Sequence, residues 1–226
     1  MPGIGKKTEA TLRGIGIDTI GKLAALSPDT LKSYFGATGR VLYRFARGID
    51  DSRVELPPEA KSISRETTFS EDSHDRPLIE AALRYLSERV GKKLRERNKQ
   101  ARTITIKVRG ADFSTATRRR TLKTSTDADQ MIFKTGLELL DRELRIQKQA
   151  IRLIGIGVSH LGETGRQLDM LDGTAAKLEQ LNKAVDKIRR KYGFTSIQTG
   201  RTYRLKDIFP EDDNRGYTLH TPSLSR

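Results

Sequence analysis

The chain has no cysteine and no tryptophan, and aromatic residues make up only 6% of its 226 residues. The absence of cysteine excludes disulfides and cysteine-based zinc sites and is typical of a protein in a reducing compartment. His74, His160 and His220 are too scattered to indicate a metal cluster. No apolar run approaches the roughly 18 residues of a membrane span, and no basic-then-apolar leader is present. We therefore expect a cytoplasmic protein with no membrane partner.

Positive charge is present in excess, since 43 Lys and Arg residues against 29 Asp and Glu residues give a formal net charge of +14. A surplus of this size predicts attraction to a polyanion and says nothing about the fold. Nucleic acid is the leading candidate partner, ahead of an anionic membrane surface or an acidic protein.

Residues 1–50 have the pattern of a small all-helical domain in which glycines separate short helices. The expected helices are Lys6 to about Arg13, a helix capped by Asp18 or Thr19 that ends near Leu26, a helix that begins at Ser27-Pro28, and about Arg40 to Arg47. Residues 51–60 include Pro57-Pro58 and are interpreted as a stiff interdomain tether, with an ordinary surface loop as the alternative.

Residues 61–162 change type and predict an α+β domain. The order is strand, helix, strand, strand, helix, strand, which favours a split βαββαβ arrangement: a four-stranded antiparallel sheet with two helices on one face. In "ARTITIKVR", the residues Ile104, Ile106 and Val108 alternate with polar residues, so one face of this strand is apolar.

The other face of the predicted sheet carries Thr103, Thr105, Lys107 and Arg109. Arg118, Arg119 and Arg120 add positive charge on the adjacent strand. Hydroxyl and cationic side chains suit phosphate oxygens, so this face indicates contact with a nucleic acid backbone. The alternative is a solvated sheet face without a partner.

The first residues, "MPGIGKKT", resemble the turn of a helix-hairpin-helix motif. Glycines admit backbone conformations that let successive N–H groups converge at the start of a helix, where an anion can bind. The residues expected to contact DNA here are Gly3, Gly5, Lys6 and Lys7. A second, weaker copy of the pattern contains Gly36, Gly39 and Arg40; a turn between two structural helices is the alternative.

Several segments together resemble the C-terminal half of a Y-family translesion DNA polymerase of the bacterial polymerase IV type: "PGIGKKT", "GRVLYRFARGID", "KSISRETTF", "ARTITIKVR" and "IRLIGIGVSHL". The resemblance implies a helix-hairpin-helix thumb domain over residues 1–50 and a little-finger domain over 61–162. It implies a function in translesion synthesis and DNA repair, in which both domains bind primer-template duplex. The little-finger contacts carry over to Lys61, Ser62, Arg65, Lys107 and Arg152, with Arg118 to Arg120 as further candidates.

Residues 163–173 contain "RQLDML", which resembles the peptide that binds the bacterial sliding clamp. Gln167, Leu168, Met170 and Leu171 would occupy the clamp groove, although Leu171 stands where an aromatic residue is common. An amphipathic helix follows over 174–192, with Leu178, Leu181, Val185 and Ile188 on its apolar face. Residues 193–226 are expected to be a largely irregular tail, disordered at its end.

The same resemblance places the magnesium-binding carboxylates on a palm domain upstream of Met1. We therefore expect no catalytic residue, metal site or cofactor in this chain, and no polymerase activity of the chain alone. Two alternatives stay open: half of a split DNA polymerase that works with a separately encoded palm-and-fingers piece, or an unrelated helix-hairpin-helix nucleic-acid-binding protein.

Overall fold

The computed structural model describes residues 1–54, 59–146, 148–163, 173–213 and 215–218, with the side chains of 173–176 left aside. The chain divides into two compact units, Met1–Pro58 and Glu59–Arg226. None of the helices in the described part of the chain has the length and hydrophobicity that crossing a membrane requires.

The described part of the first unit contains four helices: α1 (Lys6–Gly14), α2 (Ile20–Ala25), α3 (Pro28–Phe35) and α4 (Ala37–Ala46). The predicted caps are confirmed, because the Thr19 hydroxyl accepts from the Lys22 amide and the Ser27 hydroxyl accepts from the Thr30 amide. Leu12, Leu23 and Leu31 form a small buried core. The fourth helix begins at Ala37 and not near Arg40, because Gly36 supplies the bend that starts it.

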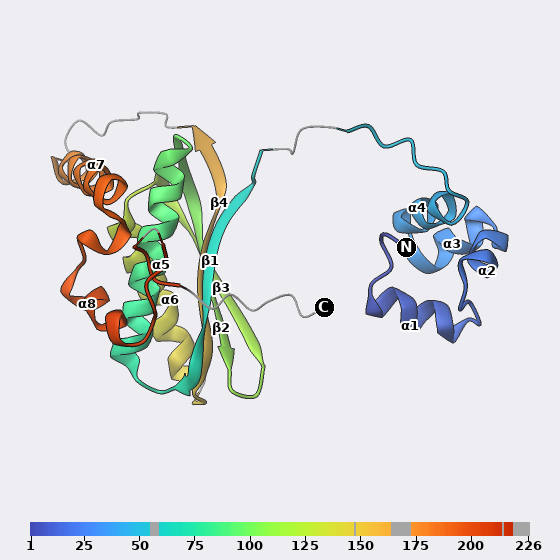
Figure 1. The fold of residues 1–226 in the computed structure, drawn as a ribbon, viewed down its shortest axis with the longest axis horizontal. Coiled ribbons are helices and arrows are strands. Elements are labelled where there is room, and N and C mark those ends of the chain that lie inside the picture. Colours follow the sequence, from blue (N-terminus) through green and yellow to red (C-terminus); the bar gives the residue numbers. More distant parts are fainter. Residues whose placement is uncertain (55–58, 147, 164–172, 214, 219–226) are drawn as a thin grey trace. The chain divides into compact units, whose positions relative to one another are not determined.

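The second unit is built on a four-stranded antiparallel sheet in the order β1-β4-β2-β3. Its strands are β1 (Ser62–Ser73), β2 (Lys99–Gly110), β3 (Thr115–Thr126) and β4 (Ile151–Glu163). The helices α5 (Arg76–Glu96) and α6 (Asp129–Ile146) cover one face of this sheet, and the described residues of this unit place no helix on the opposite face (Figure 1). The predicted α+β fold with a split βαββαβ domain is confirmed.

Alternation along the strands places the apolar side chains under the two helices. Ile104, Ile106 and Val108 on β2 are fully buried and face Val158, Ile156 and Ile154 on β4. The predicted apolar face of α5 completes this core, since Ile79, Leu83, Leu86, Val90 and Leu94 are all buried.

A third layer follows the sheet and the helix pair. It consists of α7 (Gly173–Tyr192), the short 3-10 helices η1 (Phe194–Ser196) and η2 (Arg204–Asp207), and α8 (Gly200–Tyr203). Figure 1 shows α7 and α8 on the side of α5 that faces away from the sheet. The described residues of the expected irregular tail are therefore packed on the domain, because Phe194, Leu205, Phe209 and Tyr217 are buried in the main core.

The orientation of α7 differs from the prediction. Leu181 is 51% exposed and Ile188 is 40% exposed, whereas Asn182 and Arg189 are buried. Asn182 exchanges side-chain hydrogen bonds of 3.1 Å with Gln130 on α6. Buried polar pairs, and not the apolar face that we expected, attach this helix.

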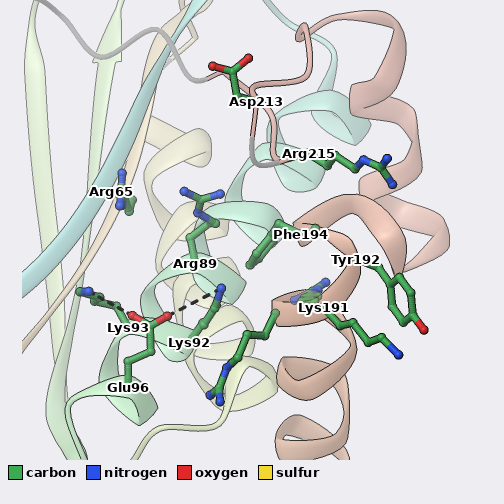
Figure 2. A pocket seen from close by; sticks show the side chains of 13 residues that line it. Arg65, Arg89, Lys92, Lys93, Glu96, Lys191, Tyr192, Phe194, Asp213 and Arg215 are labelled. Carbon is green, nitrogen blue, oxygen red and sulfur yellow. Dashed lines mark hydrogen bonds and ion pairs between the residues drawn. The ribbon is translucent and has the colours of Figure 1, made fainter.

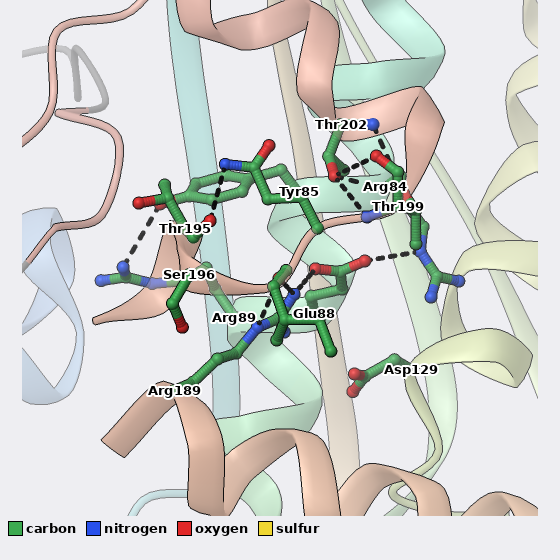
Figure 3. Close-up of polar contacts among 12 residues, drawn as sticks. Arg84, Tyr85, Glu88, Arg89, Asp129, Arg189, Thr195, Ser196, Thr199 and Thr202 are labelled. Carbon is green, nitrogen blue, oxygen red and sulfur yellow. Dashed lines mark hydrogen bonds and ion pairs between the residues drawn. The ribbon is translucent and has the colours of Figure 1, made fainter. Parts of the chain in front are cut away.

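A second set of attachments is a chain of buried charges (Figure 3). Arg189 on α7 donates to Glu88 on α5 at 2.5 Å, and Arg84 donates to the other oxygen of Glu88 at 2.8 Å. Further along α5, Arg95 binds Asp186 on α7 through two nitrogens and Asp129 on α6 at 2.8 Å. These ion pairs fix α7 relative to α5 and α6.

Candidate nucleic-acid interface

The uncovered face of the sheet is formed by rows of facing residues from β1, β4, β2 and β3. We call it the open face. Its rows are Ser62–Ser159–Thr103–Thr121, Ser64–Gly157–Thr105–Arg119, Glu66–Gly155–Lys107–Thr117 and Thr68–Leu153–Arg109–Thr115. Most residues of these rows are hydroxyl residues or glycines. The open face is therefore polar and has mainly short side chains, with long ones only at a few positions.

Three cations rise from the open face. Lys107 is 2.9 Å from Glu66 across the glycine at position 155, and Arg109 donates to the Thr115 hydroxyl at 2.9 Å. Arg119 is exposed and has no carboxylate partner among the described residues. Only one acidic residue stands among them, so the face keeps a positive surplus that suits phosphate oxygens.

Thr103 lies on the open face but is not available to a ligand. Its hydroxyl is 2.9 Å from both the Thr121 hydroxyl and Nδ1 of His160, and the residue is 2% exposed. Thr105, which we also predicted, is half-buried in the adjacent row.

Of Arg118, Arg119 and Arg120, which we expected to add positive charge on this strand, only Arg119 lies on the open face. Arg118 faces Ile106 and Arg120 faces Ile104, so both point to the helix side of the sheet. Nε of Arg118 lies 2.9 Å from Glu143 on α6, and Arg120 forms an ion pair with Glu138 of the same helix. These two arginines stabilise the contact between β3 and α6.

Arg65 also lies on the helix side, because it shares one face of β1 with the buried residues Ile63 and Thr67. It is therefore not part of the open face, and its contact with DNA stays a prediction. Ser62 belongs to the open face, and Lys61 is exposed just before it. Arg152 forms an ion pair of 3.2 Å with Asp72 and stacks over Phe113, 4.7 Å from the ring centroid.

In the first unit, α1 and α4 both follow a glycine and begin without a side-chain cap. The helices α2 and α3, in contrast, have hydroxyl caps. The first N–H groups of an uncapped helix are free to bind an anion. Gly3 has a φ of +80° in the turn before α1, and Lys6 and Lys7 are exposed on its first turn.

The second copy of this pattern is only partly available. Gly39 is buried where α4 meets α3, and a side chain there would collide with the backbone of Leu31. Gly39 is therefore a packing residue, and its contact with DNA stays a prediction. Gly36, with a φ of +58°, and Arg40 are exposed.

Among the residues that the structure describes, no group of three or more His, Cys, Asp or Glu side chains could hold a metal ion. The predicted clamp-binding residues Gln167, Leu168, Met170 and Leu171 lie outside the described residues.

Two sequence families match this chain in the order that the fold shows. The thumb domain of DNA polymerase iota matches residues 1–50, and the C-terminal domain of the impB/mucB/samB family matches residues 60–170. The chain belongs to the Y family of DNA polymerases.

Curated relatives of this Y-family chain are DNA polymerases IV. The protein from Dehalococcoides mccartyi strain CBDB1 is 52% identical over 209 residues, which is 92% of this chain and 53% of the relative. The protein from Brucella melitensis is 38% identical over 89% of this chain and 45% of the relative. The chain thus spans about half the length of the curated relatives it matches.

A solved Y-family DNA polymerase chimera has the same fold, with a TM-score of 0.57 and 21% identity over 73% of this chain and 47% of the chimera. In Y-family terms, the first unit is the thumb and the sheet with α5 and α6 is the little finger. The third layer, from residue 173 onward, lies outside both matched domains.

Sequence reasoning missed one feature of this Y-family chain entirely. Cations from β1, α5 and the third layer line a common pocket of about 680 Å³ on the helix side of the sheet (Figure 2). The basic run "KIRRKY" at the end of α7 was the available signal, but its position against α5 depends on the tertiary fold.

Proposed function

We propose that this chain is the duplex-binding portion of a DNA polymerase IV-like enzyme. The thumb and the open face of the little finger bind the sugar-phosphate backbone of primer-template DNA. The observation that carries this proposal is the open face itself, where Lys107, Arg109 and Arg119 rise from a floor of hydroxyl residues and glycines.

The glycines on β4 support close approach of a DNA strand. A Cβ atom at Gly155 would lie 2.9 Å from that of Glu66, and one at Gly157 would lie 3.1 Å from that of Ser64. Larger residues would therefore crowd their neighbours and raise the centre of the face. With hydrogen atoms at these positions, a phosphate can reach the hydroxyl groups of Ser64 and Thr105 on either side.

In this proposal, the thumb contacts DNA phosphates through its backbone amide groups. A phosphate at the start of α1 accepts from free amides beside Lys6 and Lys7, and a second phosphate is bound in the same way at α4 beside Arg40. Neither surface presents groups arranged to read base edges, so binding depends on phosphate and not on sequence.

We further propose that the metal-dependent chemistry is supplied by residues outside these 226. Y-family polymerases as a class place that chemistry on the palm, and the chain spans about half of its relatives. Incubation of the purified chain with primer-template, magnesium and all four nucleotides should leave the primer unextended; robust extension would overturn this part. In the complete enzyme, duplex binding by the thumb and the open face serves translesion synthesis and DNA repair in the cytoplasm.

The segment around Gln167 is proposed to bind the sliding clamp. The Gln amide and the aliphatic residues Leu168, Met170 and Leu171 provide a polar anchor and apolar anchors for a preformed groove. Pull-down on immobilised clamp tests this, since Gln167→Ala should abolish retention and leave duplex affinity unchanged. Equal retention of both proteins would contradict it.

Fluorescence anisotropy with labelled duplexes tests the main proposal. Duplexes of unrelated sequence should bind with similar Kd, and the logarithm of the affinity should fall linearly with the logarithm of salt, by about 0.9 per phosphate neutralised. An affinity that does not change with salt concentration, or that depends on one base sequence, would contradict binding through the DNA backbone.

A further inference from the structure

The pocket on the helix side of the little finger has a marked charge imbalance. Of its lining residues, eight are Lys or Arg and two are Asp or Glu. They come from three separate parts of the fold: β1, the second half of α5, and the segment from the end of α7 to Arg215. Figure 2 shows Arg65, Arg89 and Lys92 on one side and Lys191 and Arg215 on the other.

Most of this charge is not neutralised within the described structure. Glu96 forms ion pairs with both Lys92 and Lys93, at 3.7 Å and 3.0 Å. Arg65, Arg190 and Arg215 are exposed, and none of them has a carboxylate partner among the described residues. A cluster of uncompensated cations around one cavity repels itself unless an anion enters.

Arg189 is a buried cation in the wall of the pocket. This residue is only 5% exposed and lines the pocket. Its Nη2 donates to Glu88 and to the Ile197 carbonyl, whereas its Nη1 is buried with no hydrogen-bond partner among the described residues. This guanidinium group adds positive charge behind the surface of the pocket, next to the exposed cations that line it.

An aromatic side chain stands at the same place. Tyr192 lines the pocket and is 51% exposed, with the Lys191 ammonium 5.0 Å from its ring centroid. Cations along a groove combined with an exposed aromatic ring are the arrangement that binds single-stranded nucleic acid, since phosphates meet the cations and a base stacks on the ring.

We propose that this pocket binds a single-stranded segment of DNA through its phosphates, with a base stacked on Tyr192. The site is separate from the open face, because Arg65 reaches it from the helix-facing side of the edge strand β1. The little finger therefore has two nucleic-acid surfaces, one for duplex and one for a single strand. This inference does not depend on the duplex contacts proposed above.

Lysine footprinting on the unmodified chain tests the proposal without any variant. The chain is acylated with an amine reagent in the presence and absence of oligo(dT), and modification is read by mass spectrometry. Oligo(dT) should protect Lys92, Lys93 and Lys191 but not the exposed Lys177 and Lys206 of the third layer, which lie outside the pocket. Equal modification with and without oligo(dT) would overturn the proposal.

A nucleoside triphosphate at the same nucleotide concentration distinguishes the source of the phosphates. If the triphosphate protects the pocket lysines and oligo(dT) does not, the assignment to a strand is wrong. A duplex without overhangs should protect lysines of the open face and the thumb and leave the pocket lysines reactive.

Matched variants give the quantitative test. Arg190→Glu, Lys191→Glu and Arg215→Glu together should weaken oligo(dT) binding by about tenfold or more, since each loses a phosphate contact. The control variant combines Lys177→Glu, Arg204→Glu and Lys206→Glu, an equal charge change on exposed residues of the same layer outside the pocket. Equal losses in both variants would show nonspecific attraction only. If the pocket variant lost affinity for duplex but kept its affinity for oligo(dT), the pocket proposal would be contradicted and the open-face proposal would not.

Discussion

The guanidinium group of Arg189 lies 2.5 Å from the carboxylate of Glu88, with side chains only 3% and 2% exposed, although 101 residues separate them in the chain. This pair joins the third layer to the little finger at the wall of the basic pocket. Since buried charges are tolerated only when paired, it links the stability of this unit to the position of α7.

Arg189→Met should lower the free energy of unfolding of the second unit by about 3 kcal/mol, because Glu88 is left with Arg84 as its only cation. Urea denaturation followed by circular dichroism measures the loss. The control is Lys183→Met, which removes an exposed ion pair with Glu179 and should cost about 0.5 kcal/mol or less. Similar losses in the two variants would contradict a buried, structural pair.

Asp129 should make stability depend on pH. Burial raises the pKa of this carboxyl to about 6, although Arg95 lies 2.8 Å away and opposes the shift. An unfolded aspartate has a pKa of about 3.9, so between about pH 4 and pH 6 the folded chain binds more protons than the unfolded chain. The contribution of Asp129 to the free energy of unfolding therefore falls as pH rises through that window.

A carboxyl-carbon NMR titration checks this directly, and Asp129 should have a midpoint near pH 6. The stability difference between the unmodified chain and Asp129→Asn should also change with pH across the window. A midpoint below about pH 4, the range of an ordinary aspartate, would show that Arg95 outweighs burial.

Gly39→Ala should destabilise the thumb by about 1–3 kcal/mol, because its Cβ would enter the space of the Leu31 backbone in the α3–α4 contact. Gly21→Ala is the matched control, since this helical glycine has open space around it, and alanine there should be neutral or stabilising by up to about 1 kcal/mol. Hydrogen exchange of the α3 and α4 amides separates the two variants. Equal exchange rates would rule out the packing role of Gly39.

Much of the fold is predictable from local sequence. The caps Thr19 and Ser27 bind the amides that their positions indicate, and the alternation of Ile104, Ile106 and Val108 identifies the buried face of β2. These features depend on neighbours in the chain, and the hydrophobic pattern marks them clearly.

The errors concern residues whose surroundings come from distant segments. The strand "TATRRRTLKT" has few apolar residues to show which of its faces is buried, so only its register with β2 reveals that Arg119 and not Arg118 lies on the open face. In α7, the apolar pattern suggested a buried face through Leu181, but Asn182 and Arg189 find their partners on α6 and α5. The packing of Phe194 and Tyr217 against Tyr85 also leaves no periodic signal.

The most direct test of duplex binding by the open face compares neighbouring arginines on opposite faces of the same sheet. Arg109→Gln with Arg119→Gln should weaken duplex binding by about tenfold and reduce the salt slope by about 2, whereas Arg118→Gln with Arg120→Gln should change affinity by less than about twofold. Both double variants lose two positive charges. A difference in duplex Kd between the two folded variants, measured by anisotropy titration, therefore shows which face of the sheet binds DNA. Equal losses, or a larger loss for Arg118 and Arg120, would contradict the account.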